Sequence, residues 1–147
     1  MKLKVLSILL LILGIGLSSC RSSTTATPSL KPLTVQDEAS LQKVLQEAGA
    51  TIETGDSINQ EFFTPEAHTV KVNGADLQVF EYKNAQAMEK EASQVAPDGG
   101  SVGTSMMTWI DTPHFYKVGR IIVLYLGNDK SLLDLLNKVM GPQFAGQ

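Results

Sequence analysis

The chain has 147 residues, with twelve basic and fifteen acidic side chains and a formal net charge of −3. This acidic balance argues against non-specific binding of nucleic acid and against electrostatic attachment to anionic lipid headgroups, because both need a basic surface. The length suggests one domain, and the single cysteine excludes a disulfide bond within the chain.

The first twenty residues have the pattern of an export signal. Lys2 and Lys4 precede an apolar run of thirteen residues, 5–17. This run is shorter than the roughly 20 residues that a membrane-spanning helix needs, and it is typical of the central part of a secretory signal. It ends at Leu17-Ser18-Ser19-Cys20, which resembles the lipobox of bacterial lipoproteins. An uncleaved helical anchor is the alternative interpretation.

The resemblance to a lipobox implies how residues 1–33 are used. Residues 1–19 would be removed as a lipoprotein signal peptide, and acyl chains on Cys20 would hold the protein to a lipid bilayer. The protein would then lie on the extracytoplasmic face of the cell membrane or of an outer membrane. Residues 20–33 would form the acylated cysteine and a flexible Ser/Thr/Pro-rich tether with an end-to-end distance of about 20 Å.

Residues 34–147 are expected to form a single globular domain, which begins with a helix. Thr34 is the expected N-cap of this helix, with Asp37 at the capping-box position. Leu41, Val44, Leu45 and Ala48 follow at the spacing of one apolar helix face, and Gly49 is the expected stop. A short strand over residues 51–54 is expected next.

A hairpin and a second helix follow in the pattern. Asn73-Gly74 separates two runs typical of strands within residues 70–79, which favours a type I′ turn. The second strand is expected to continue to about Tyr82. Asn84 is the expected N-cap of a helix that ends before Pro97.

The second half of the domain predicts further strands and a closing helix. Residues 106–110 suggest one strand, and residues 114–118 and 121–126 suggest a hairpin that turns near Gly119. Because residues 121–126 are apolar throughout, we expect this strand at the centre of the sheet. A third helix is expected over residues 129–140 and ends at Gly141-Pro142.

These elements predict an α+β fold: an antiparallel sheet of about six strands with helices packed on one face. The order of helix, strand and hairpin occurs twice before the closing helix. A duplicated αβββ unit with a C-terminal helix would explain this order, and a chance rhythm in a small α+β domain would explain it equally well.

Three segments also resemble a set of small, uncharacterised bacterial lipoproteins and secreted proteins. They are residues 72–82, Pro113-His114-Phe115-Tyr116 with residues 119–125, and Gly141-Pro142-Gln143-Phe144. The resemblance implies a bacterial, extracytoplasmic protein with a single domain. It implies no activity.

The sequence offers little catalytic chemistry. His68 and His114 are far apart, so no metal-ligand spacing is present, and we expect no metal and no cofactor. Residues 99–104 are rich in glycine but lack the lysine of a phosphate-binding loop. Asp111 and His114 could pair as a general base and its orienter, but no serine or cysteine completes a nucleophilic set nearby. We therefore expect a protein that is not an enzyme.

The aromatic residues are the remaining candidates for contact with a ligand or partner. Trp109, His114, Phe115 and Tyr116 gather around Pro113. They could form a contact patch on an uncovered sheet face, since aromatic residues are common anchors of interfaces. Alternatively, they fill the core of a domain that has no disulfide bond.

Three hypotheses for the function follow. The first is a membrane-anchored binding or accessory module whose partner is an envelope protein or another ligand. The second is a small envelope hydrolase that uses Asp111 and His114. The third is a structural envelope lipoprotein without a specific ligand. A nucleic-acid partner is not expected.

Overall fold

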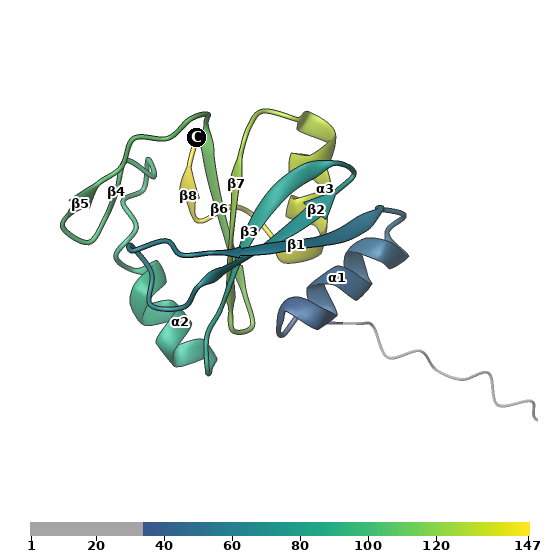
Figure 1. The fold of residues 1–147 in the computed structure, drawn as a ribbon, viewed down its shortest axis with the longest axis horizontal. Coiled ribbons are helices and arrows are strands. Elements are labelled where there is room, and N and C mark those ends of the chain that lie inside the picture. The colour runs from purple at the N-terminus through teal and green to yellow at the C-terminus, as the bar shows by residue number, and fades with distance from the viewer. Residues whose placement is uncertain (1–33) are drawn as a thin grey trace, which may run out of the picture. The chain divides into compact units, whose positions relative to one another are not determined.

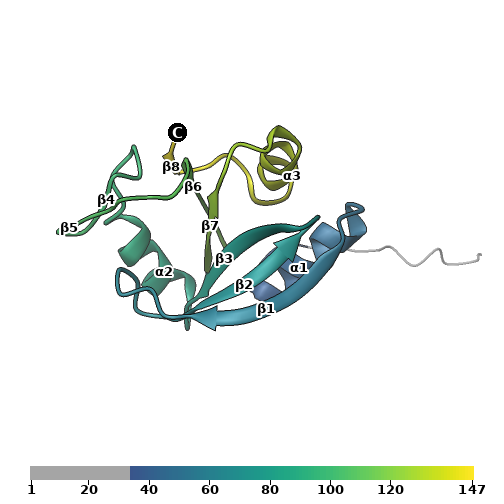
Figure 2. The same ribbon diagram turned by 45° about the horizontal axis from the view of Figure 1, so that its top comes forward.

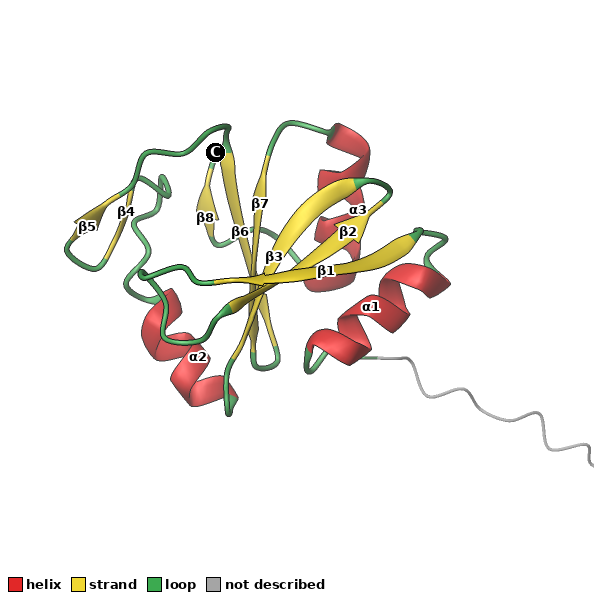
Figure 3. Cartoon of the chain, viewed as in Figure 1, coloured by secondary structure: helices red, strands yellow, loops and turns green. Residues whose placement is uncertain are grey.

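The computed structural model describes residues 34–147, so the expected signal peptide, Cys20 and the tether lie outside the described residues. The described residues form three helices and eight strands (Figures 1 and 3). Their bounds are α1 Glu38–Glu47, β1 Ile52–Ile58, β2 Ala67–Val72, β3 Ala75–Glu81, α2 Ala85–Ala92, β4 Ser101–Val102, β5 Ser105–Met106, β6 Pro113–Val118, β7 Ile121–Leu126, α3 Lys130–Met140 and β8 Ala145–Gly146.

Six of the described strands form one antiparallel sheet in the order β1-β2-β3-β7-β6-β8. The α+β class and the six-stranded antiparallel sheet are thus confirmed. β7 lies in the interior of the sheet between β3 and β6, as its apolar sequence predicted. β1 is an edge strand with a bulge, in which Gly55 and Asp56 lie opposite the single residue Thr69 of β2.

The turn and two of the helix starts agree with the local sequence signals. Asn73 and Gly74 have φ values of 52° and 87°, which are the left-handed conformations of a type I′ turn. Asn84 caps α2 through its side chain, and Asp129 caps α3 in the same way. The first helix differs: its N-cap is Asp37 and not Thr34, and Asp37 forms a capping box with Ser40.

The strand expected over residues 106–110 is wrong. Instead, β4 and β5 form a separate two-stranded hairpin in which Ser101 pairs with Met106. This hairpin extends away from the main sheet in Figure 1. Residues 107–111 then return without strand structure to Pro113, where β6 begins.

Both faces of the sheet are covered by apolar residues, because successive residues of a strand point to opposite sides. One face packs against α1 and α3, with Leu41, Leu45 and Leu136 fully buried. The other face packs against α2, through Met88 and Ala92, and against the segments that precede β2 and β6. Figures 1 and 2 show α2 and α3 on opposite sides of β7.

The position of α2 differs from the expected arrangement with all helices on one face. The central strands β3 and β7 are antiparallel, so two repeated units would be related by a two-fold axis normal to the sheet. Such an axis would place α1 and α2 on the same face. Because α2 lies on the other face and β4–β5 stay outside the main sheet, the two halves of the domain are not equivalent.

The first described residues are fixed at one end of the sheet. The backbone N–H of Arg120 donates to the carbonyl oxygen of Gln36 at 2.9 Å, and the N–H of Tyr82 donates to the carbonyl oxygen of Arg120 at 2.9 Å. Glu81 accepts a bond from the backbone N–H of Glu38 at 2.9 Å. We call this region, defined by Gln36, Tyr82 and Arg120, the amino-terminal end of the domain; it is the lower end in Figure 1.

Candidate functional site

The four aromatic residues singled out in the sequence do not share one surface. Phe115 and Trp109 belong to the apolar cluster on the α2 side of the sheet. Tyr116 belongs to the cluster on the opposite side, where His114 stacks on Tyr125 with ring centroids 6.0 Å apart. Phe115 and Tyr116 are fully buried, and His114 is 4% exposed. These three side chains therefore contribute to the core.

Trp109 is the member of this group that reaches the surface in part. Its indole N–H donates to the carbonyl oxygen of Gly99 at 2.7 Å, and its ring meets those of Phe62 and Phe115 edge to face. The hydrogen bond ties the segment that precedes β6 to the loop that follows α2. Trp109 thus holds two loops together over the α2 side of the sheet.

The structure does not bring Asp111 and His114 together as a catalytic pair. Nδ1 of His114 lies 2.7 Å from Oε1 of Gln143, whereas Asp111 accepts a bond from the side chain of Asn128 at 2.9 Å. Nε2 of His114 and the hydroxyl of Tyr116 are buried without a hydrogen-bond partner among the described residues. Neither of these two atoms lines either of the two pockets described below.

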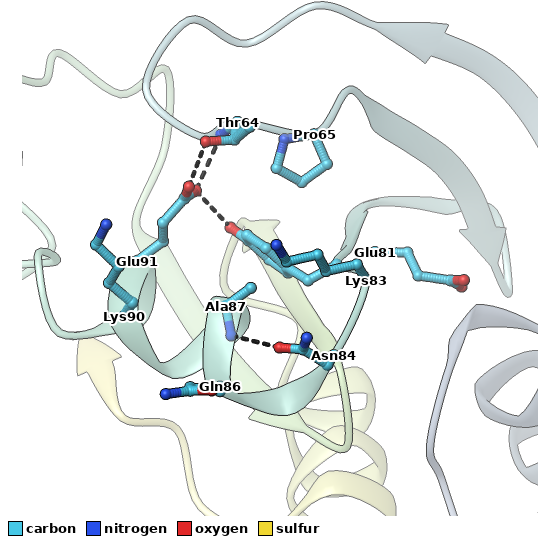
Figure 4. A pocket seen from close by; sticks show the side chains of 10 residues that line it. Thr64, Pro65, Glu81, Lys83, Asn84, Gln86, Ala87, Lys90 and Glu91 are labelled. Carbon is cyan, nitrogen blue, oxygen red and sulfur yellow. Dashed lines mark hydrogen bonds between the residues drawn. The ribbon is translucent and has the colours of Figure 1, made fainter.

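A pocket of about 660 Å³ lies beside the amino-terminal end of the domain (Figure 4). Its walls come from the loop before β2, from the last residues of β3 and the turn after it, and from the first two turns of α2. We call it the α2 pocket. It is lined by Thr64, Pro65, Glu81, Tyr82, Lys83, Asn84, Gln86, Ala87, Lys90 and Glu91.

Glu91 holds the α2 pocket together from the helix side. Its carboxylate accepts bonds from the backbone N–H of Thr64 at 2.9 Å, from the Thr64 hydroxyl, and from the Tyr82 hydroxyl at 3.1 Å (Figure 4). Burial raises the pKa of the Tyr82 phenol, and the charge of Glu91 raises it further. The phenol therefore remains a hydrogen-bond donor to Glu91 under ordinary conditions.

The other carboxylate of the α2 pocket, Glu81, also has partners. The guanidinium of Arg120 donates to Glu81 at 2.7 Å, and the same guanidinium lies 3.5 Å from Asp37. By contrast, the side-chain amines of Lys83 and Lys90 make no ion pair or hydrogen bond with the described residues. The two carboxylates of the pocket thus have hydrogen-bond or ion-pair partners, whereas its two lysine amines have none among the described residues.

A second pocket, of about 450 Å³, lies on the α2 side of the sheet, near the start of β3 and the end of β7. Thr69, Gln78 and Leu124 contribute to its lining, and Ile58 and Ile110 lie at its margin with 39% and 94% of their surface exposed. The pocket is therefore partly apolar and open to solvent.

Sequence reasoning missed the α2 pocket. Its lining residues fall in two segments, 64–65 and 81–91, and nothing in the local sequence shows that Thr64 meets Glu91 across 27 positions. The one signal in the local sequence is Asn84, the N-cap that fixes the start of α2 at Ala85.

Residues 34–147 contain no group of three or more His, Cys, Asp or Glu side chains that could hold a metal ion. Within the same residues, no helix has both the length and the apolar character needed to cross a membrane. Comparisons with models of protein families, with curated proteins and with solved structures gave no match to this chain.

Proposed function

We propose that this protein is a bacterial lipoprotein of the cell envelope, anchored on the extracytoplasmic side of a membrane by acyl chains on Cys20, and that its domain is a binding or accessory module. The observation that carries the proposal is the run of residues 5–17 followed by Leu17-Ser18-Ser19-Cys20. A charged start, an apolar run of limited length, small residues and a cysteine occur together in the order that lipoprotein export requires.

The form of the domain supports a binding role. The α2 pocket is open and lies at the same end of the domain as the first described residues, which the proposed tether would precede. Two or three acyl chains suffice for stable anchoring, because each buried methylene contributes about 0.8 kcal/mol. Residues 21–33 would then hold the domain at a typical distance of about 20 Å from the membrane surface.

Mass spectrometry of the protein from its native host tests the anchor. We expect an amino-terminal peptide that begins at Cys20 and carries the added mass of acyl chains. In a Cys20→Ser variant we expect an unprocessed chain that retains Met1. The matched control is Ser19→Ala, which keeps a small residue beside the cysteine and should be processed and acylated like the wild type.

Two results would contradict the anchor. One is an intact amino terminus with an unmodified Cys20 in the wild type. The other is acylation that persists elsewhere in the Cys20→Ser variant. Extraction of the wild type from membranes by salt or alkaline washing, without detergent, would also argue against acyl anchoring, because such washes do not remove lipid chains from a bilayer.

A further inference from the structure

The unpaired lysines of the α2 pocket distinguish it from the rest of the domain. Residues 34–147 carry eight basic and fifteen acidic side chains, so basic groups are the minority in this domain. Four described lysines have side-chain amines without an ion pair or hydrogen bond: Lys43, Lys83, Lys90 and Lys138. Two of these four line the same pocket.

The two lysines belong to different elements. Lys83 follows β3, and Lys90 lies on α2, so the pocket separates the points at which they leave the backbone (Figure 4). Neither lysine forms an ion pair with a nearby carboxylate, because Glu81 is bound to Arg120 and Glu91 accepts three bonds from neutral groups of Thr64 and Tyr82. Glu91 keeps its negative charge in this arrangement. An anion that entered the pocket would therefore have to bind through the two lysine amines and away from the Glu91 carboxylate.

We propose that the α2 pocket binds a phosphate monoester, whose double negative charge the amines of Lys83 and Lys90 balance. Lysine is a common phosphate ligand that acts as a point charge. Pro65 and Ala87 add an apolar part to the lining, which suits a small organic group attached to the phosphate. The backbone N–H of Gln86, in the first turn of α2, is a further available donor.

The proposal rests on the proposed binding role and names the chemistry of the ligand. Such a monoester could be a soluble molecule of the envelope or the headgroup of a membrane lipid, and both would present the same group to the two lysines. The pocket lies at the same end of the domain as the first described residues, which the proposed tether would precede. Binding should weaken as ionic strength rises, because the lysines are exposed and salt screens their charges.

The test uses the full-length protein isolated from its membrane in a non-ionic detergent, with phenyl phosphate as the probe. Amide shifts are followed by NMR. We expect saturable shifts at residues of the α2 pocket, and a loss of affinity of about fivefold in each of Lys83→Gln and Lys90→Gln. Lys43→Gln and Lys138→Gln change the net charge equally and should bind like the wild type.

Two outcomes would overturn the proposal: no saturable shifts in the pocket, or equal weakening in all four lysine variants, which would indicate a general effect of charge. A second arm places the protein in phosphatidylcholine nanodiscs with or without phosphatidic acid. If phosphatidic acid competes with the probe, a lipid headgroup is the source of the phosphate. If the probe binds and phosphatidic acid does not compete, the ligand is a soluble molecule. Either result supports phosphate recognition.

Failure of the pocket proposal and failure of the anchor are distinguishable in the same preparation. An unmodified Cys20 with probe binding would refute the anchor alone. An acylated Cys20 without probe binding would refute the phosphate site alone. The amide spectrum of each lysine variant also reports whether the variant is folded, so a loss of binding cannot be confused with unfolding.

Discussion

Gly119 lets the β6–β7 turn pack against Gln36 at the amino-terminal end of the domain. Replacing it with alanine should therefore lower the free energy of unfolding. Gly119 has a φ of 59°, and a Cβ atom there would lie 2.4, 2.5 and 2.7 Å from the backbone O, Cα and C atoms of Gln36. Such contacts are with the main chain, which cannot rotate away like a flexible side chain. The backbone at Gln36 would have to move.

The expected cost can be assembled from three parts. A non-glycine residue in the left-handed region costs about 1 kcal/mol. Moving Gln36 breaks the hydrogen bond from Arg120, which contributes about 1 kcal/mol. The shift also disturbs Val35, which is 3% exposed, and partial loss of its burial costs about 1 kcal/mol. Gly119→Ala should therefore lower the free energy of unfolding by about 3 kcal/mol.

Gly74→Ala is the matched control, because Gly74 has a φ of 87° and no atom within 4 Å of an added Cβ. It should cost about 1 kcal/mol, from backbone conformation alone. Urea unfolding followed by the fluorescence of Trp109 measures both variants, and the difference of about 2 kcal/mol corresponds to about 1 M in the midpoint. Equal midpoints for the two variants would refute the packing of Gln36 against the β6–β7 turn.

Three further predictions concern stability. Leu136→Ala should lower the free energy of unfolding by about 3 kcal/mol, and Leu133→Ala by much less, because Leu136 is fully buried and Leu133 only in part; equal urea midpoints would contradict this. Because burial raises the pKa of Tyr82 in the folded protein, stability should fall as pH rises above about 10, and Tyr82→Phe should reduce that fall in urea midpoints. Because hydrogen bonds from Ser40 lower the pKa of Asp37, the stability they contribute is present above about pH 4 and is lost on acidification. Asp37→Asn should therefore lose less stability than the wild type between neutral and acidic pH. Parallel curves of unfolding free energy against pH for the two proteins would refute this.

Much of the fold could be predicted because its signals are local. Asn73-Gly74 specifies its turn within two residues, and the apolar residues 121–126 indicate a strand that is buried on both faces. The start of α1 was not predictable in this way, because Thr34 and Asp37 are both suitable caps. The choice depends on the bond between Gln36 and Arg120, which joins residues far apart in the sequence and keeps the chain extended as far as Asp37.

The candidate site was beyond the reach of local patterns for the same reason. The aromatic residues around Pro113 drew attention as a group in the sequence, but strand alternation sends Phe115 and Tyr116 to opposite faces. The α2 pocket depends on the contact between Thr64 and Glu91, which no periodic pattern in the sequence indicates. Pairs of this kind become visible only when the topology of the sheet is known.

The bulge in β1 has a consequence for the proposed membrane anchor. Molecules anchored as proposed would meet one another in two dimensions, with their edge strands at similar heights. A long, regular edge would invite neighbouring copies to join their sheets and aggregate. The irregular step at Gly55 and Asp56 interrupts the row of free backbone groups along β1, and β8, at the opposite edge, has only two residues. Both borders of the sheet thus discourage self-association among close neighbours.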